Sequence, residues 1–165
     1  MAEMNITFDE LMRYTQEERD KWRGYFDTQA EAMELEVQPG GRHATIGALI
    51  DHIFLVERRH VQRLMSEPVD SKTGLSGHFV GPLFDYGASV RRELTQYASD
   101  LDDYAADEPR TFTVATGDFV LTPRKLLFHC LLHETRHWAQ IALAVRRAGL
   151  EPPGNHDLFF SKALK

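Results

Sequence analysis

Three histidines recur every four residues near the carboxyl end of the sequence: His129, His133 and His137. On a helix, four residues turn about 400°, so the three imidazoles would fall within a stripe of about 80°. The other members of this stripe are apolar or amide side chains: Leu126, Cys130, Gln140 and Ala144. We therefore expect the stripe to face inward, where neutral imidazoles one turn apart can share a divalent metal ion. Three ligands on one straight helix span about two turns, so His129 is expected to support the site or pack rather than bind the ion.

The segment from His133 to His137 also spells H-E-x-x-H, the zinc metalloprotease motif in which the glutamate acts as general base. The extended form of that motif needs glycine at position 140 and histidine at position 143, where this chain has Gln140 and Leu143. The one glutamate further along, Glu151, lies in a proline-flanked tail, and no β-sheet is expected upstream to bound a cleft. The context therefore argues against a protease.

Two further side chains beside the histidines have two interpretations each. Glu134 could act as a base toward a metal-activated water, or it could be a solvated helix residue paired with Arg136 or Arg146. Gln140 could hydrogen-bond a ligand ring and fix its tautomer, or it could be an amide packed in the core.

A third ligand is expected from an earlier helix, which carries His52 and His60. The apolar positions of that helix are Ile46, Leu49, Ile53, Val56 and Leu64. This apolar stripe is centred nearer His60 and places His52 at its edge, so the pattern alone does not decide between them.

The helices that position these residues can be predicted from residues that typically start and end helices. Thr7 and Glu10 form a capping box for a first helix running to about Val37, and Thr45 can cap a second helix running to about Ser66. The remaining expected elements are a helix from Pro82 to about Ala106, a hairpin within 111–122, and a last helix delimited by Thr122, Pro123 and Gly149. The tail, 151–165, is expected to pack through Phe159 and Phe160. These elements predict an all-α four-helix bundle in one domain, 1–165, with a small β-hairpin before the last helix.

Composition excludes several classes of protein. The chain has 165 residues, a formal net charge of −6 and a single cysteine, Cys130. One cysteine forms no internal disulfide and is expected to be a small buried apolar residue. The acidic balance argues against nucleic acid as a partner, and the lack of a long apolar run argues against a membrane partner. We expect a cytoplasmic protein.

The residues that carry these signals also resemble the DinB/YfiT-like superfamily of metalloenzymes. The stretch Thr45-Ile46 through Ile50-Asp51-His52 is similar to that family's T-[IV]-x-x-[LV]-[LIV]-x-H pattern, and His133, His137 and Gln140-Ile141 resemble its final H-x-x-x-H-x-x-Q-[IL]. The resemblance covers nearly the whole chain, including the hairpin. It implies a four-helix bundle with His52, His133 and His137 as ligands of one divalent metal ion. It leaves His60 a packing or supporting role, and His129 is often histidine in the family without being a ligand.

The resemblance also implies an activity. Members with assigned function include thiol S-transferases and isomerases that use low-molecular-weight thiols such as bacillithiol or mycothiol, and homodimers are common. Imidazole suits Zn²⁺, Ni²⁺, Fe²⁺ and Mn²⁺, so the ion is not specified. We expect a metal-dependent transferase acting on a small-molecule substrate. The alternatives are a metal-dependent hydrolase with Glu134 as base, and a non-catalytic metal-binding stress protein in which Cys130 or His60 completes the coordination sphere.

Overall fold

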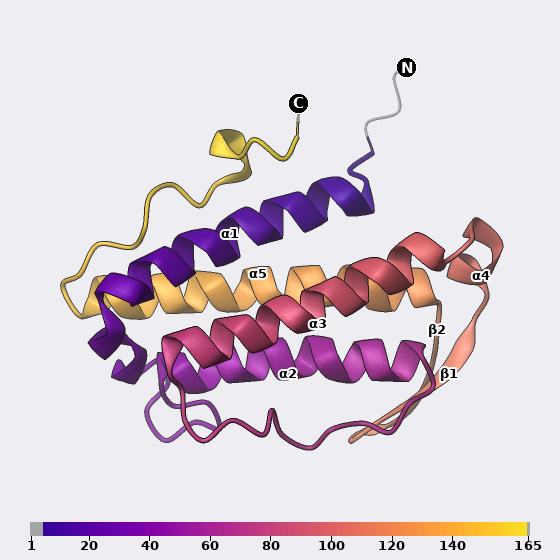
Figure 1. Ribbon diagram of the computed structural model, residues 1–165, viewed down its shortest axis with the longest axis horizontal. Helices are drawn as coiled ribbons and strands as arrows, with labels where there is room; N and C mark the ends of the chain where they lie inside the picture. Colours follow the sequence, from indigo (N-terminus) through magenta and orange to yellow (C-terminus); the bar gives the residue numbers. More distant parts are fainter. Residues whose placement is uncertain (1–4, 165) are drawn as a thin grey trace.

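The computed structural model describes residues 5–164 and shows long helices lying side by side, with a β-hairpin at one end (Figure 1). Within these residues the long helices are α1 (Phe8–Thr28), α2 (Ile46–Leu64), α3 (Val80–Asp100) and α5 (Pro123–Arg147). The shorter elements are the 3-10 helices η1 (Ala30–Glu34) and η2 (Leu158–Phe160), helix α4 (Asp103–Asp107), and the strands β1 (Arg110–Val114) and β2 (Gly117–Leu121). The predicted all-α bundle with a hairpin before the last helix is confirmed.

Three helix starts follow the predicted capping chemistry. The Thr7 hydroxyl accepts a hydrogen bond from the Glu10 amide, and the Glu10 carboxylate accepts one from the Thr7 amide. The hydroxyls of Thr45 and Thr122 accept in the same way from the amides three residues further on. Each side chain satisfies a backbone donor that the first helical turn leaves free.

Two helix ends differ from the prediction. The first helix was expected to continue to about Val37, but α1 ends at Thr28 and the chain tightens into η1. The third helix was expected to reach Ala106, but α3 ends at Asp100. The Asp102 carboxylate accepts a hydrogen bond from the Ala105 amide at 2.8 Å and starts the short helix α4. An aspartate that caps a new helix competes with continuation of the old one.

Helices α2 and α3 begin at the same end of the bundle because a long loop returns along α2 (Figure 1). The Thr73 hydroxyl in this loop donates to the Asp51 carboxylate at 2.7 Å. Further along, the loop passes so close to Gly47 that a Cβ on this residue would lie only 2.6 Å from the His78 Cβ. Glycine at position 47 therefore permits the close approach. Helix α2 packs against α3 and α5, and α1 packs against the same two helices from the opposite corner.

Four charged residues cross the middle of the core, one from each long helix: Arg19, Glu57, Arg91 and Glu134. We call this group the ionic layer. Arg91 Nε donates to Glu57 Oε1 at 2.9 Å and Arg19 Nε donates to Glu134 Oε1 at 2.7 Å. Apolar clusters fill the bundle on both sides of the layer, one around Trp22, Phe54 and Trp138 and the other around Leu94, Leu127 and Leu131.

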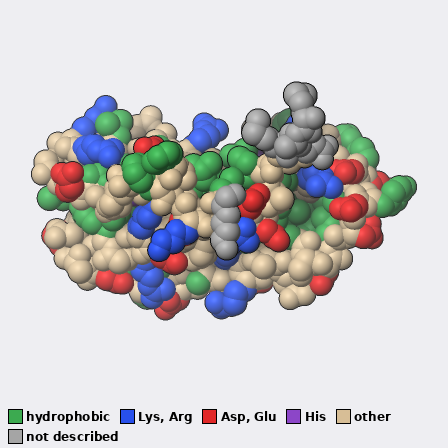
Figure 2. All heavy atoms as spheres, turned by 90° about the horizontal axis from the view of Figure 1, so that it is seen from above, with side chains coloured by type: hydrophobic (Ala, Val, Ile, Leu, Met, Phe, Trp, Pro, Cys, Tyr) green, Lys and Arg blue, Asp and Glu red, His purple; other side chains and the backbone are tan. Residues whose placement is uncertain are grey.

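The C-terminal segment runs back beside α1, and Figure 2 shows this face with basic, acidic and apolar side chains interspersed. The prediction that Phe159 and Phe160 anchor this segment is wrong, because they are 88% and 56% exposed. His156 anchors it instead. Its ring stacks on Trp22 with centroids 5.2 Å apart, and its carbonyl accepts from the Tyr14 hydroxyl at 2.7 Å.

No helix within residues 5–164 combines the length and apolar character that crossing a lipid bilayer demands.

Candidate metal centre

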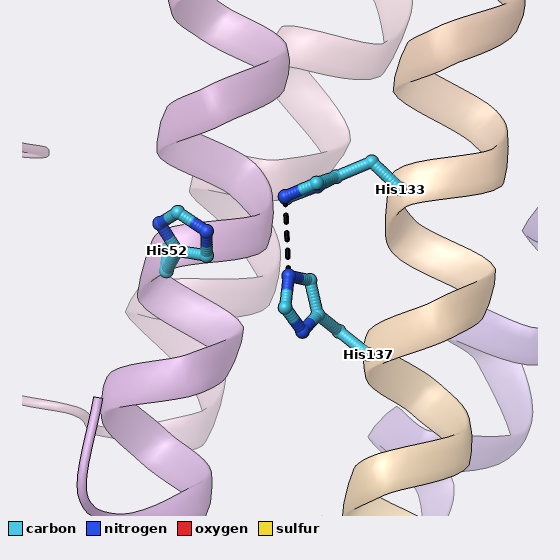
Figure 3. A group of neighbouring side chains, drawn as sticks. All are labelled: His52, His133 and His137. Atoms are coloured by element: carbon cyan, nitrogen blue, oxygen red, sulfur yellow. Dashed lines mark hydrogen bonds between the residues drawn. The ribbon is translucent and has the colours of Figure 1, made fainter. Parts of the chain in front are cut away.

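Helices α2 and α5 bring three histidines together: His52 from α2, and His133 and His137 from α5 (Figure 3). We call them the histidine triad. One nitrogen from each ring can be chosen so that all three lie within 4.8 Å of one another. All three side chains are half-buried. Of the stripe predicted to face the core, Leu126, Cys130 and Ala144 are buried as expected, whereas His133 and His137 lie at the edge of the α2–α5 interface.

The two α5 histidines present the same ring nitrogen to each other. Their Nε2 atoms are 3.1 Å apart, and His137 Nδ1 lies 2.6 Å from Gln140 Oε1. The amide oxygen accepts the Nδ1 proton, so His137 Nε2 presents a lone pair toward His133. Without a cation, His133 must place a proton between the two nitrogens. A metal ion can replace that proton, so the donor set suits a divalent cation.

Burial keeps these rings neutral near pH 7. It lowers the pKa of His133 to about 3, with the neighbouring His137 and His52 adding to the effect. It lowers the pKa of His52 to about 4, again with help from nearby histidines. Burial also lowers the pKa of His137, although the hydrogen bond to Gln140 opposes the shift. Only neutral imidazole binds a metal, so the triad is in its ligand form.

A residue that sequence reasoning missed, His43, stacks on His52 with ring centroids 4.0 Å apart. It lies in the loop before α2, which the Val37 amide fastens by donating to the Ala44 carbonyl at 2.8 Å. Gly40 permits the loop's turn because its φ is +68°. No helical period connects His43 to the triad, so spacing carried no signal for it.

A cavity of about 400 Å³ opens beside His137. We call it the polar cavity, because its lining includes Gln38, His43, Gln140 and Arg147. Arg147 is exposed at the end of α5 and supplies a positive charge.

The two remaining predicted histidines form a second pair outside the triad. His60 from α2 and His129 from α5 meet edge to face with centroids 5.3 Å apart, and His129 lies 5.6 Å from His133. His60 is 9% exposed, and its Nδ1 has no hydrogen-bond partner among residues 5–164. The structure thus places His60 and His129 beside the triad, on the same two helices.

Glu134 has neither of the roles expected from the sequence. It is fully buried in the ionic layer, where it accepts from Arg19, Arg91 and the Trp138 indole. Burial alone would raise the pKa of its carboxyl, but Arg19 and Arg91 outweigh burial and hold that pKa below its usual range. A carboxylate held by two guanidinium groups is a poor base. The prediction that Glu134 acts as a base is therefore wrong, and so is the prediction that it pairs with Arg136 or Arg146. Without Glu134, the H-E-x-x-H motif has no general base.

Cys130 is a buried apolar residue, as predicted. Its thiol is 2% exposed and donates to the Leu126 carbonyl. Burial raises the pKa of this thiol far above its usual range, so thiolate is not available at neutral pH.

Comparison with known proteins supports the family suggested by the motifs. A search of curated proteins finds no match to this chain. The sequence model of the DinB family matches residues 3–163, nearly the whole chain. The chain belongs to the DinB family.

Proposed function

We propose that this chain is a metal-dependent enzyme that transfers a low-molecular-weight thiol to an electrophilic small molecule. The observation that carries the proposal is the triad itself: three neutral, half-buried imidazoles that converge between α2 and α5, with a cavity beside His137. Within residues 5–164, no fourth histidine, cysteine or carboxylate belongs to this group. Three protein ligands with open positions are typical of catalytic rather than structural metal sites.

The chain would bind Zn²⁺, Ni²⁺, Fe²⁺ or Mn²⁺ through His52, His133 and His137. Such an ion lowers the pKa of a bound thiol, so that the nucleophilic thiolate is present at neutral pH. In the transfer, sulfur forms a bond to the electrophilic carbon, the thiol proton passes to water, and the leaving group departs with its bonding electrons. Gln140 holds the His137 tautomer that presents Nε2 to the site.

The polar cavity supports the choice of a thiol cosubstrate. Bacillithiol and mycothiol are polar molecules, and a cavity of about 400 Å³ with amide, imidazole and guanidinium groups suits a ligand of that kind. Arg147 would pair with a carboxylate on a thiol that carries one, such as bacillithiol. Metal-dependent hydrolysis is less favoured, since its expected base, Glu134, is held in the ionic layer.

The first experiment measures metal content by elemental analysis on untagged protein. We expect one ion per chain in the wild type and loss of that ion in His52→Ala, His133→Ala and His137→Ala. His60→Ala and His129→Ala are matched controls that should keep it. Metal retained after loss of His52 would overturn the site.

The second experiment measures thiol transfer. Metal-loaded protein is supplied with bacillithiol, mycothiol or glutathione and an aryl halide, and the thioether product is quantified. We expect product with at least one thiol in the wild type and none in His52→Ala. Metal binding without product from any of these thiols would favour the non-catalytic metal-binding protein.

A further inference from the structure

A second, smaller pocket lies between the β-hairpin and helices α2 and α5. Its volume is about 140 Å³, and we call it the hairpin pocket. The side chains that matter for its chemistry are Phe112, Phe119, Leu126, His60, His129 and Lys125. An apolar cavity of about 150 Å³ in another protein binds benzene, so the hairpin pocket has the size of one six-membered ring.

The hairpin is built to present apolar side chains to this pocket. Phe112 and Phe119 are register partners, so they lie on the same face of the two-stranded sheet. Val120, the next residue of β2, is 70% exposed on the other face. Arg63 of α2 donates from Nε to the Thr113 carbonyl at 2.8 Å, which ties the hairpin to the bundle. This contact holds the hairpin against the helix that supplies His60 to the pocket wall.

The polar groups of the pocket indicate what kind of ring fits. His60 and His129 line it, so the wall of the pocket carries imidazole groups that can hydrogen-bond a polar atom on a ring. The formal charge in the lining is the cation of Lys125, and no carboxylate lines the pocket within residues 5–164. These groups favour a neutral or anionic ring over a cationic one.

The pocket also lies next to the metal centre. His129 lines it, and the His129 ring is 5.6 Å from that of His133. The polar cavity adjoins the other α5 ligand, His137. The triad therefore has a polar compartment beside one ligand and an apolar compartment toward the other.

We propose that the hairpin pocket holds a ring-sized apolar group of the electrophilic substrate, a phenyl ring bearing a hydroxyl or carbonyl. The polar cavity would then hold the thiol, and the two substrates would meet at the triad. This inference rests on the proposed function for the substrate's role, but ring binding can be measured without catalysis.

The test uses phenol as a probe in ligand-observed NMR, with benzylamine as the cationic control. We expect saturable binding of phenol and none of benzylamine. Val114 also lines the pocket, on the same face of β1 as Phe112. Val114→Phe should therefore fill the pocket and weaken phenol binding by about tenfold or more, equivalent to about 1.4 kcal/mol. Val120→Ala, on the outer face of the same hairpin, should leave phenol binding unchanged.

A second measurement connects the pocket to the metal. In protein loaded with Mn²⁺, a paramagnetic ion, the proton signals of bound phenol should broaden in the wild type. They should broaden much less in Val114→Phe, which binds phenol more weakly, and should not broaden in His52→Ala, which loses the ion.

The possible failures are distinguishable. Phenol binding in a protein that takes up no metal would overturn the proposed function and leave the ring site intact. Metal uptake with no phenol binding, or phenol binding that Val114→Phe does not weaken, would overturn this inference and leave the metal centre standing.

Discussion

Gln140 shows how one side chain outside the ligand set can control a metal site. Its amide oxygen lies 2.6 Å from His137 Nδ1 and selects the tautomer that exposes Nε2. Without it, the ring can rotate or place its proton on the nitrogen that should bind the ion. Groups of this kind typically contribute a factor of 10 to 100 in metal affinity or activity.

We therefore predict that Gln140→Ala weakens metal affinity by about 10- to 100-fold, measured by competition with a chromophoric chelator. Gln140→Glu keeps an acceptor oxygen at the same place, so it should bind metal about as well as the wild type. Equal affinities in the Ala variant and the wild type would show that Gln140 has no role in the site.

His60 provides a residue-level prediction about pH. Burial, assisted by His129, Arg63 and Arg59, lowers the pKa of His60 to about 3 in the folded protein. The unfolded chain has a histidine pKa near 6.5 and so binds the proton more readily. The stabilisation from neutral His60 is thus present above about pH 6.5 and is lost as the pH falls toward about 3.

We expect urea unfolding of metal-free protein to show this dependence between pH 6.5 and 4.5. In that range the free energy of unfolding should fall more steeply for the wild type than for His60→Phe, by up to about 1.4 kcal/mol per pH unit. Comparing the two proteins cancels the titration of the triad. Parallel curves would mean that His60 is protonated equally in both states.

At the scale of elements, the ionic layer is the contact that all four long helices share. Arg19, Glu57, Arg91 and Glu134 alternate in charge, and each is nearly inaccessible to solvent. Burying four charges is costly, and only complete pairing offsets that cost. The layer therefore favours one arrangement of the helices, in which every charge has its partners.

Glu134→Gln should destabilise the protein by about 3 to 5 kcal/mol, because it leaves two buried guanidinium groups with one carboxylate. Arg136→Ala, two residues away and exposed, should change the free energy of unfolding by less than about 0.5 kcal/mol. Chemical denaturation measures both. The folded Glu134→Gln protein should still bind its metal, since Glu134 faces the ionic layer; loss of the ion without unfolding would contradict this placement.

The ionic layer also explains which parts of the site could be predicted. Local signals are readable from sequence, so the caps at Thr7, Thr45 and Thr122 were predicted correctly. The burial of Glu134 was not predicted, because a glutamate on a helix ordinarily faces water. Glu134 is buried only because its partners Arg19 and Arg91 arrive from distant parts of the chain.

The same reasoning applies to the histidines. An interval of four residues placed His133 and His137 together, but periodicity could not choose between His52 and His60 on α2. The choice depends on how α2 and α5 are rotated against each other, which is set by packing across the whole bundle. In the structure, His52 meets the α5 pair and His60 meets His129.

At the scale of the whole molecule, the C-terminal segment shows how far side-chain type alone can mislead. Two adjacent phenylalanines were expected to anchor it, yet the segment is held by the His156 side chain and by polar contacts to its backbone. Arg13 donates to the Ala163 carbonyl at 3.1 Å and Lys21 donates to the Asn155 carbonyl at 2.7 Å.

The expected homodimer stays a prediction. Sedimentation of the metal-loaded protein would measure its oligomeric state.

Metal binding should also stabilise the molecule as a whole, because the triad joins α2 to α5 and the unfolded chain does not hold the three rings together. A ligand at about a thousand times its dissociation constant adds about 4 kcal/mol to the free energy of unfolding. For a chain of this size each kcal/mol raises Tm by about 2 to 4 °C, so chelation should lower Tm by about 10 °C. Differential scanning calorimetry should show that drop in the wild type and in His129→Ala, and none in His52→Ala. An equal drop in His52→Ala would place the stabilising ion elsewhere, since that variant keeps the rest of the bundle but lacks the one ligand from α2.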